Sequence, residues 1–576
     1  MVQANRLESI MDLVKNLDLS PVRLSNLEMG YVYEELLQRF SQDDAKDTGE
    51  HFTPREVIRL MVGLLDIDLN AILNNRAISI YDPACGTGGM LSVAKEHLID
   101  AVKTPADAEK VKNLVMLYGQ ELLPQNYAVC LADMLIKDER LDVDDRNQRQ
   151  PVQQITNGNS LIAEDGISKE LGDFHQHQQF DYMLSNPPFG VDWGEYKKDV
   201  EGFRQTRYTA GLPPTNDGSL LFLQSMIGKM KPVTSLPAPK TGEGMNGSRI
   251  AILFNGSPLS NGDALSGELE IRRHLLQNDL VDAIVMLPDQ LFYSTGIYTY
   301  IWVLTNHKPD HKQGKVLIVN ARDQFEKEPK SFGNKRNRIT DAQRATILDR
   351  YHRYEDSDTT KIFRTSNFAF HKVEVTYWLH DEENNPLYQI EPFDVQLNNA
   401  NVKRKFDLYG ELAFAVLLKQ AHTGSDGLMT HITEYPVTFT YDGEDAFDTL
   451  LARALLEQQP TAVDGKSVKD IKNYLKVAAL EVVYTHRHYM VDNEYIPCDP
   501  DATDRAAYIG SFLAREIEFP IVRWQEAEQL GYEILPNKYF YRYEEPTPSD
   551  QLIDEFWQLE EEAEAILTQI RTPETV

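Results

Sequence analysis

A turn of four residues carries the clearest chemical signal in this sequence. Asn186-Pro187-Pro188-Phe189 directly follows Tyr182–Ser185, an apolar run that we predict to be a buried strand. The two prolines favour a rigid, extended turn that presents an amide side chain and a neighbouring carbonyl as acceptors. Two acceptors facing one amino group would hold its hydrogens and aim its lone pair, and Phe189 offers a flat surface for stacking a base taken out of a duplex. A purely structural proline turn is the alternative.

A glycine-rich segment gives the second signal. Asp82-Pro83-Ala84-Cys85-Gly86-Thr87-Gly88-Gly89-Met90 lies between a predicted strand, Ala77–Tyr81, and a predicted helix, Met90–Leu98. Such a turn lets the backbone approach a ligand closely, and in an open α/β sheet it is where an adenosine-bearing cofactor lies. The carboxylate of Asp82 disfavours a pyrophosphate and favours the ammonium group of S-adenosylmethionine. An ordinary glycine-rich turn is the alternative.

An acidic residue follows the next predicted strand. Glu121 comes shortly after Val115–Gly119. An acidic side chain at this point typically accepts hydrogen bonds from ribose hydroxyls. Taken alone this signal is weak, because most such glutamates are simply exposed.

Alternating strands and helices must position these residues. Further strand-like runs are Arg249–Phe254, Val281–Leu287 and Tyr300–Leu304, and helices are predicted at Leu220–Met230 and Gly267–Leu276. This alternation predicts βαβ units and a mostly parallel sheet. The fold class is therefore α/β, with a Rossmann-like sheet.

Changes of pattern divide the chain into four parts. We predict a helical segment over residues 1–50, a catalytic domain over 51–325, and a mixed, then mostly helical, C-terminal region over 326–545. Within these parts, a helix begins at Thr53-Pro54 with Thr53 as its N-cap. A charged loop and helix start are predicted for 325–345, and helix for 445–490.

The last part, residues 546–576, is predicted to be a helix with an apolar seam. Its apolar residues recur at alternating intervals of four and three, which is heptad spacing: Leu552, Phe556, Leu559, Ala563, Ile566 and Ile570. Packing on the chain's own domain and docking on another subunit fit this spacing equally well.

Composition and charge exclude several classes of protein. The 576 residues carry a formal charge of −31, which opposes tight DNA binding by this chain alone unless one cleft or a partner supplies basic residues. Apolar runs stay far below the ~20 residues of a membrane helix, no secretory signal is visible, and three cysteines cannot form a disulfide framework. We expect a soluble, cytoplasmic protein with no membrane partner. His486 and His488 lack a third ligand, so no metal is predicted.

The motifs together resemble those of N6-adenine DNA methyltransferases, and most closely the modification subunit of type I restriction–modification systems. The matching segments run from near residue 18 to near residue 570: His51–Val57, Asp82–Met90, Gly119–Glu121, Asn159–Leu161, Asn186–Phe189, Ile271–Arg273, Leu287–Ile297, Gly531–Ile534 and Tyr539–Tyr541.

The resemblance implies an S-adenosylmethionine-dependent fold and a set of site residues. It implies that the cofactor is held by His51, Phe52, Thr53, Pro54, Asp82, Ala84, Gly86, Thr87, Gly88, Gly89, Glu121, Asn159, Ser160 and Leu161. Within that set, the glycine-rich segment would contact the methionine part, Glu121 the ribose and Asn159 the adenine; relatives often have Asp at position 159. Asn186, Pro187, Pro188 and Phe189 would hold the target adenine.

The resemblance also implies partners and a mechanism. The amine of a flipped adenine attacks the methyl group in line, so catalysis is mainly positioning and polarisation. The implied partners are double-stranded DNA, a specificity subunit, a second copy of this chain and, where one exists, a restriction subunit. Relatives usually carry a helical domain ahead of the segment near Leu17, whereas only residues 1–50 precede His51 here. We expect that domain to be encoded separately, lost or removed.

Two other functions compete with DNA methylation. The Asn-Pro-Pro-aromatic turn also occurs in enzymes that methylate a protein glutamine, although these usually have Tyr in place of Phe189 and are much shorter. A scaffold that holds DNA or cofactor without turnover is the second alternative, which the intact Asp82, Gly86, Asn186 and Phe189 disfavour.

Overall fold

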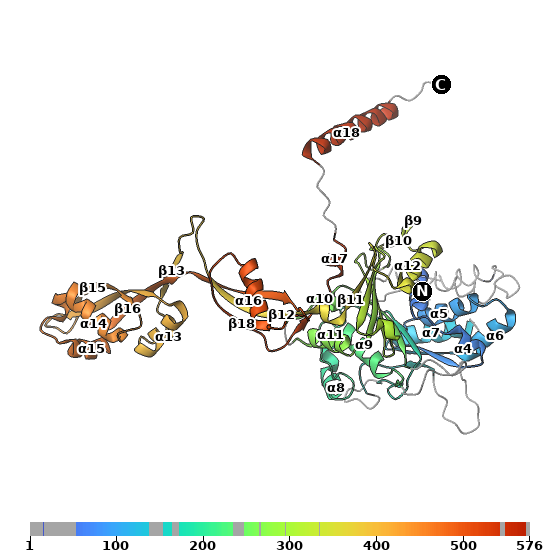
Figure 1. Ribbon diagram of the computed structural model, residues 1–576, viewed down its shortest axis with the longest axis horizontal. Helices are drawn as coiled ribbons and strands as arrows, with labels where there is room; N and C mark the ends of the chain where they lie inside the picture. The colour runs from blue at the N-terminus through green and yellow to red at the C-terminus, as the bar shows by residue number, and fades with distance from the viewer. Residues whose placement is uncertain are drawn as a thin grey trace. The chain divides into compact units, whose positions relative to one another are not determined.

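A nine-stranded sheet organises the first of two units into which the chain divides (Figure 1). The computed structural model describes residues 53–136, 154–163, 172–233, 247–263, 266–293, 295–332, 334–541 and 548–571, together with residue 15. Unit 1 comprises Met1–Gly262, Ser266–Thr365 and Glu533–Val576, and unit 2 comprises Asp263–Leu265 and Ser366–Tyr532.

The central sheet is mostly parallel, as the alternation of strands and helices predicts. Its spatial order is β11-β8-β6-β7-β5-β4-β1-β2-β3. Strand β7 runs antiparallel between β5 and β6, and β11 runs antiparallel to β8, whereas the other neighbours are parallel. The strands are β1 (Ile78–Asp82), β2 (Val115–Glu121), β3 (Ile155–Asn157), β4 (Tyr182–Ser185), β5 (Arg249–Phe254), β6 (Val281–Met286), β7 (Tyr300–Thr305), β8 (Lys315–Asn320) and β11 (Thr360–Arg364).

Continuous apolar runs explain why the middle of the sheet is so well predicted. Every residue of β4, β5, β6 and β7 is buried, because both faces of these central strands are covered. Strands β4 and β5 begin and end where the sequence predicts. Parallel β1, β2, β3 and β4 end at the same edge of the sheet, and this edge carries the predicted site residues.

Helices cover the sheet and complete the core of unit 1. Buried side chains of α3, α5 and α12 form one cluster with alternate strand residues, such as Ile80, Leu184 and Leu253. The helices of this unit are α3 (Arg55–Leu64), α4 (Leu69–Leu73), α5 (Gly89–Asp100), α6 (Pro105–Leu114), α7 (Pro124–Ile136), α8 (Lys197–Gly202), α9 (Ser219–Gly228), α10 (Ser257–Ser260), α11 (Gly267–Gln277), α12 (Asp341–Arg353), α17 (Pro536–Tyr539) and α18 (Ser549–Arg571).

The start of α3 differs from the prediction by one residue. Pro54 is the N-cap, and no side chain caps the helix. The hydroxyl of Thr53, which we expected to cap the helix, instead accepts a hydrogen bond from the side chain of Asn186. A residue predicted to stabilise a helix end therefore contacts the predicted catalytic turn.

A charged hairpin replaces the loop predicted for residues 325–345. Strands β9 (Glu326–Phe332) and β10 (Lys335–Arg338) pair antiparallel before α12 begins. Lys335 is buried and pairs with both Glu56 and Glu328. The hairpin was missed because ion pairs, and not alternating apolar residues, stabilise it.

Unit 2 corrects the prediction of a mostly helical C-terminal region. It contains two four-stranded sheets among its described residues. The first sheet has β17 (Tyr489–Pro497), β12 (Ala369–Trp378), β18 (Ile521–Glu526) and β19 (Gly531–Tyr532), and α16 (Arg505–Glu516) packs on it. The second has β13 (Tyr388–Pro392), β16 (Ala479–Arg487), β14 (Leu412–Thr423) and β15 (Met429–Tyr441), with α13 (Asn399–Tyr409), α14 (Phe447–Gln458) and α15 (Val468–Leu475).

The helix predicted for residues 445–490 is accordingly interrupted. Helices α14 and α15 occupy its first part, and β16 occupies much of the rest. Burial alternates along β14, with Leu412, Phe414, Val416 and Leu418 facing the helices. This two-residue period is typical of a sheet with one covered face.

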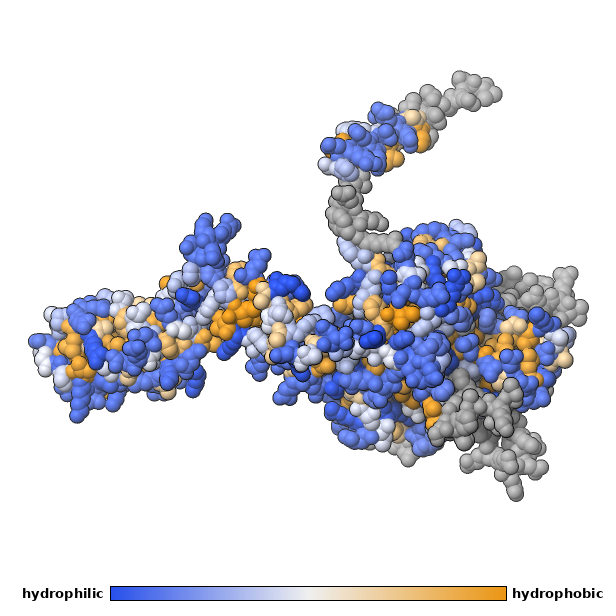
Figure 2. Space-filling view, in the orientation of Figure 1, coloured by the Kyte–Doolittle hydropathy of each residue, from blue (hydrophilic) through white to orange (hydrophobic). Residues whose placement is uncertain are grey.

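Helix α18 is the last described element of the chain, and its surface is exposed. Its side chains are exposed from Ser549 to Leu567, including the heptad residues Leu552, Phe556, Leu559 and Ile566. Figure 2 shows apolar patches on this helix among hydrophilic residues. Within the part of the chain that the structure describes, no helix is both long enough and apolar enough to cross a bilayer.

Candidate active site

A cavity of about 570 Å³ opens at the carboxyl ends of β1, β2, β3 and β4. This volume is within the range of small-molecule sites, roughly 300–1,000 Å³. The predicted site residues that line it are Thr53, Asp82, Ala84, Gly86, Thr87, Gly89, Glu121, Asn159, Ser160, Leu161, Asn186, Pro188 and Phe189. The structure therefore brings together residues from five separate segments of the chain.

Three described residues of the predicted site are not among those lining the cavity. Pro54 and Pro187 are buried behind the residues that face it, and Gly88 holds the turn before α5. His51 and Phe52 lie outside the described residues.

Asp82, the last residue of β1, presents an unsatisfied carboxylate oxygen. Its Oδ1 accepts hydrogen bonds from the Ala84 N–H at 3.0 Å and from the Ser185 hydroxyl at 2.7 Å. Its Oδ2 is buried and has no hydrogen-bond partner within the described part of the chain. Burial raises the pKa of Asp82 to about 7, although both hydrogen bonds oppose this shift. A cationic group at Oδ2 would supply the partner that this atom lacks.

The turn after Asp82 needs glycine at two positions. Gly86 has a φ of +55° and Gly88 a φ of +84°, in the left-handed region that L side chains rarely adopt. A Cβ on Gly88 would also lie 2.6 Å from Cys130 Sγ of α7. The backbone of the turn therefore lies close against α7 at Gly88, and α5 begins at Gly89.

Glu121 at the end of β2 ties the two loops of the cavity together. Its Oε2 accepts a hydrogen bond from the Gly86 N–H at 2.9 Å, and its Oε1 accepts one from the Leu123 N–H at 2.9 Å. The carboxylate is buried and lines the cavity. This carboxylate therefore holds the glycine-rich turn and the loop after β2 together at the wall of the cavity.

The polar side chains of the turn after β3 form hydrogen bonds with other groups of the protein. Asn159 Oδ1 accepts a hydrogen bond from the Leu161 N–H at 3.0 Å, and Ser160 Oγ donates one to the Pro83 carbonyl at 2.5 Å. The Ser160 hydroxyl is thus a cross-link between the turn after β3 and the glycine-rich turn. Asn159, Ser160 and Leu161 all line the cavity.

The turn after β4 places an amide oxygen without a partner at the cavity. Asn186 Nδ2 donates a hydrogen bond to Thr53 Oγ1 at 2.9 Å. Asn186 Oδ1 is buried, and none of the described residues gives it a hydrogen-bond partner. Because leaving a buried acceptor unsatisfied costs about 1–3 kcal/mol, this atom is suited to a ligand donor. Phe189 is partly buried, and its side chain packs against the hydrophobic core of unit 1.

The cavity also has lining residues that the sequence motifs did not single out. They include Ile58, Leu122, Asn126, Trp193, Tyr196 and Phe222. Leu122 directly follows Glu121, and Trp193 and Tyr196 follow Phe189, so proximity to the motifs could have indicated them. Phe222 comes from α9, and nothing local in the sequence marks it.

The histidine pair considered as a metal site lies in unit 2. His486 is buried, its ring stacks on Tyr409 with centroids 4.0 Å apart, and its Nδ1 lies 2.7 Å from the Arg487 carbonyl oxygen. Across the described ranges of the chain, no group of three or more His, Cys, Asp or Glu residues is arranged as metal ligands.

Comparison with known proteins identifies the family. Residues 25–374, more than half of the chain, match the model of the N-6 DNA methylases. The type I restriction enzyme MjaIX methylase subunit of Methanocaldococcus jannaschii is 27% identical over 346 residues, which are 59% of this chain and 51% of that protein. The HindI methylase subunit of Haemophilus influenzae is 29% identical over 345 residues, 59% of this chain and 63% of that protein.

A solved structure is also similar. The type I restriction–modification methyltransferase subunit of Streptococcus thermophilus superposes with a TM-score of 0.46 and 21% identity, covering 62% of this chain and 64% of that chain. The chain spans between about half and two thirds of the length of the two curated relatives. On the match of the family model, the chain belongs to the N-6 DNA methylase family.

Proposed function

We propose that this chain transfers a methyl group from S-adenosylmethionine to the N6 amine of an adenine in DNA. The observation that carries the proposal is the pair of buried acceptors without partners, Asp82 Oδ2 and Asn186 Oδ1, on residues that line one cavity. A carboxylate suits the ammonium group of the cofactor, and an amide oxygen suits an amino group. Asp82 is the last residue of β1, and Asn186 directly follows β4, which is the parallel neighbour of β1. A cofactor held at Asp82 and a base held at Asn186 would therefore meet.

The residues of the cavity fit the cofactor by their chemistry. Asp82 would hold its ammonium group, Glu121 its ribose hydroxyls, and the turn Asn159–Leu161 its adenine. When bound, S-adenosylmethionine supplies an electrophilic methyl group on a sulfonium centre. The backbone of Gly86 and Gly89 allows a ligand to approach closely, because no Cβ is present.

The side chains after β4 would act on the target base. Asn186 Oδ1 and a neighbouring backbone carbonyl accept the two hydrogens of the adenine amine, which aims the nitrogen lone pair at the methyl group. The base must leave the duplex to reach the cavity, and Phe189 gives it a surface for stacking. No strong base is required, because positioning and polarisation of the amine supply the rate enhancement.

We further propose that the chain works with a DNA-reading partner. Its charge of −31 opposes the phosphate backbone, so a specificity subunit would supply sequence recognition and much of the DNA contact. Both relatives are methylase subunits of type I restriction enzymes, which supports this division of work. The exposed seam of α18 is the proposed docking surface for that subunit.

The test uses S-adenosylmethionine with a labelled methyl group. The chain is incubated with DNA, with and without the specificity subunit, and the labelled nucleoside is identified. We expect N6-methyladenine only when the partner is present. Asn186→Ala should bind cofactor normally and transfer no methyl group. Label in protein amides, or transfer by the Asn186→Ala variant, would contradict the proposal.

A further inference from the structure

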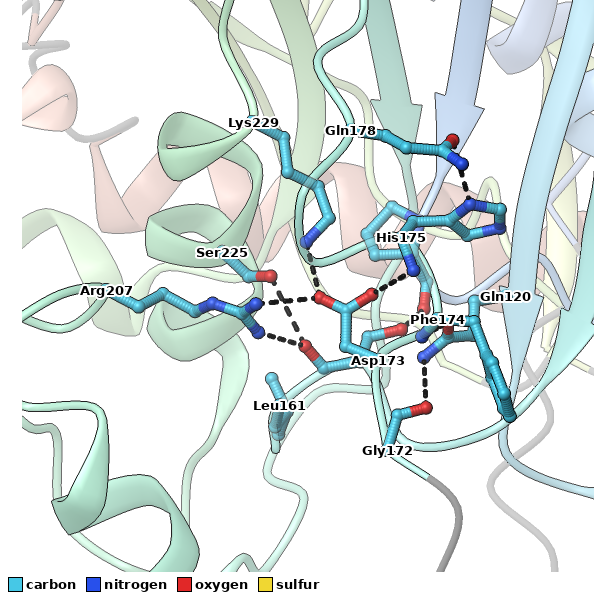
Figure 3. Close-up of polar contacts among 12 residues, drawn as sticks. Gln120, Leu161, Gly172, Asp173, Phe174, His175, Gln178, Arg207, Ser225 and Lys229 are labelled. Carbon is cyan, nitrogen blue, oxygen red and sulfur yellow. Dashed lines mark hydrogen bonds and ion pairs between the residues drawn. The ribbon is translucent and has the colours of Figure 1, made fainter. Parts of the chain in front are cut away.

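A buried charge cluster lies directly behind the turn that follows β3. Asp173 is fully buried, and its Oδ2 is paired with both Arg207 and Lys229, while its Oδ1 accepts a hydrogen bond from the His175 N–H at 2.9 Å. Figure 3 shows Arg207 and Lys229 pointing toward this one carboxylate. None of these residues lines the cavity, and none belongs to the motifs that the sequence singled out.

Arg207 also contacts the turn itself. Its Nη2 lies 2.9 Å from Asp173 Oδ2, and its Nη1 donates a hydrogen bond to the Ser160 carbonyl at 3.1 Å. The guanidinium lies over the Phe203 ring, 4.7 Å from its centroid, which fixes the plane of the fork. A planar, rigid guanidinium can hold two acceptors at once, whereas the ammonium of a lysine is a point charge on a flexible chain.

Other donors complete the support of this turn. The Ser225 hydroxyl of α9 donates to the same Ser160 carbonyl at 3.3 Å, and the Tyr208 hydroxyl donates to the Leu161 carbonyl at 2.8 Å. The carbonyls of Ser160 and Leu161 are therefore bound by side chains that are not among those lining the cavity. The three residues of the turn, Asn159, Ser160 and Leu161, line the cavity.

We propose that Arg207 is a positioning residue that sets the cofactor's adenine subsite by joining Asp173 to the Ser160 carbonyl. This inference rests on the proposed function, in which the turn Asn159–Leu161 holds the adenine. Binding sites need supporting residues that lock their contacts in place, because a small misplacement of a contact weakens binding. Arg207 would provide that support without touching the cofactor.

Lys229 offers a matched comparison within the same cluster. It pairs with the same Asp173 oxygen and is more deeply buried than Arg207, but no hydrogen bond joins its ammonium group to the turn among the contacts of the described residues. Lys229→Met removes one of two cations and leaves the Asp173–Arg207 pair. Arg207→Lys keeps the charge beside Asp173 and removes the fork. An effect specific to Arg207→Lys therefore reports on the contact with Ser160.

The experiment measures the dissociation constant of S-adenosylhomocysteine by calorimetry, on the full chain and both variants, with the thermal midpoint recorded in parallel. One hydrogen bond to a charged group corresponds to roughly a tenfold change in affinity. We expect Arg207→Lys to weaken binding about tenfold and Lys229→Met to leave it within about twofold. At saturating S-adenosylmethionine, the kcat of Arg207→Lys should stay close to that of the unmodified chain.

A fragment of the cofactor locates the effect. Methylthioadenosine has the adenine and ribose but lacks the amino acid, so Arg207→Lys should weaken it by the same factor as S-adenosylhomocysteine. Asp82→Asn should weaken only S-adenosylhomocysteine. Equal dissociation constants for Arg207→Lys and the unmodified chain, or equal losses in Arg207→Lys and Lys229→Met, would overturn this inference alone. An unmodified chain that binds neither compound would overturn the proposed function itself.

Discussion

The orientation of one amide decides what the candidate site can accept. Asn186 could present either its oxygen or its NH2 group to the cavity, and only the oxygen can accept a hydrogen from an amine. In this structure Nδ2 donates a hydrogen bond to Thr53 Oγ1, and Oδ1 has no hydrogen-bond partner among the described residues. We propose that Thr53 positions Asn186 toward the target base, in addition to lining the cavity.

Substitution of Thr53 tests this role. Thr53→Val keeps the shape and removes the acceptor, so Asn186 loses its fixed orientation. We expect kcat to fall about threefold to tenfold, the equivalent of one hydrogen bond, with the cofactor KM unchanged. Thr53→Ser retains the hydroxyl and should restore kcat. A raised cofactor KM with normal kcat would instead make Thr53 a cofactor contact only.

The ionisation of Asp82 makes cofactor affinity depend on pH. Burial raises its pKa to about 7, so the free protein carries a neutral carboxyl below that pH. The raised pKa stabilises the folded chain below the unfolded value of about 3.8, and this contribution is lost as the pH rises to 7. A cofactor ammonium requires the charged form, so its binding is opposed below pH 7.

The affinity for S-adenosylhomocysteine should therefore rise about tenfold from pH 6 to pH 8, because the binding-competent carboxylate grows from roughly a tenth of the molecules to most of them. Calorimetry in two buffers of different ionisation enthalpy should detect a released proton at pH 6. Asp82→Asn should bind weakly at both pH values with no slope. A flat profile for the unmodified chain would show that the ammonium group does not lie at Asp82.

The turn between β1 and α5 depends on backbone geometry more than on side-chain contacts. Gly88 combines a φ of +84° with a Cβ position 2.6 Å from Cys130 Sγ, whereas a Cβ on Gly89 would meet nothing within 4 Å. Gly88→Ala should destabilise the chain by roughly 2 kcal/mol or more and weaken cofactor binding. Gly89→Ala, at the first position of α5, should leave the thermal midpoint unchanged or higher.

A double variant separates the two causes. Cys130→Ala removes the sulfur and leaves the strained φ, so it should restore only part of the stability that Gly88→Ala loses. Full recovery in the double variant would assign the whole effect to the clash, and no loss in Gly88→Ala would contradict both arguments. The measurement is the thermal unfolding of the unmodified chain, Gly88→Ala, Cys130→Ala and the double variant in parallel.

Elements built on apolar periodicity could be predicted, and elements built on charge could not. Strands β4 and β5 match their predictions because a buried strand needs a continuous apolar run. The hairpin β9–β10 was missed, because Lys335 is buried there through ion pairs with Glu56 and Glu328. Contacts between residues distant in sequence leave no local periodicity to detect.

The same distinction holds for the candidate site. Motifs that follow strands could be placed at one sheet edge, because parallel strands end together, and Asp82, Glu121 and Asn186 do line one cavity. The support behind that edge could not be predicted. Asp173 is 34 residues from Arg207 and 56 from Lys229 in sequence, and only the folded chain joins them. Ser160 was predicted as a cofactor contact, yet its hydroxyl is bound to Pro83.

At the scale of the whole molecule, an acidic character is combined with one helix that has no cover among the described residues. A formal charge of −31 opposes DNA contact by this chain alone. Helix α18 exposes a row of apolar residues, whereas the apolar faces of α3, α5 and α12 are buried in the core of unit 1. The exposed fractions of Leu552, Phe556, Leu559 and Ile566 lie between 52% and 65%. Heptad seams of this kind are buried in coiled coils, so the seam fits a helix of the proposed specificity subunit.

Two alanines on α18 allow a matched test of that docking. Ala563 lies on the heptad seam, and Ala565 lies two positions on, about 200° around the helix and therefore on the opposite side. Ala563→Asp should weaken assembly with the specificity subunit, because it puts a charge into an apolar interface, while Ala565→Asp should assemble normally. Both should bind S-adenosylhomocysteine with unchanged affinity, since neither is in the cavity. Size-exclusion chromatography with the co-expressed partner measures assembly. If the two variants assemble with the specificity subunit equally well, the seam of α18 is not the docking surface. If Ala563→Asp still methylates DNA, methylation does not depend on docking through α18.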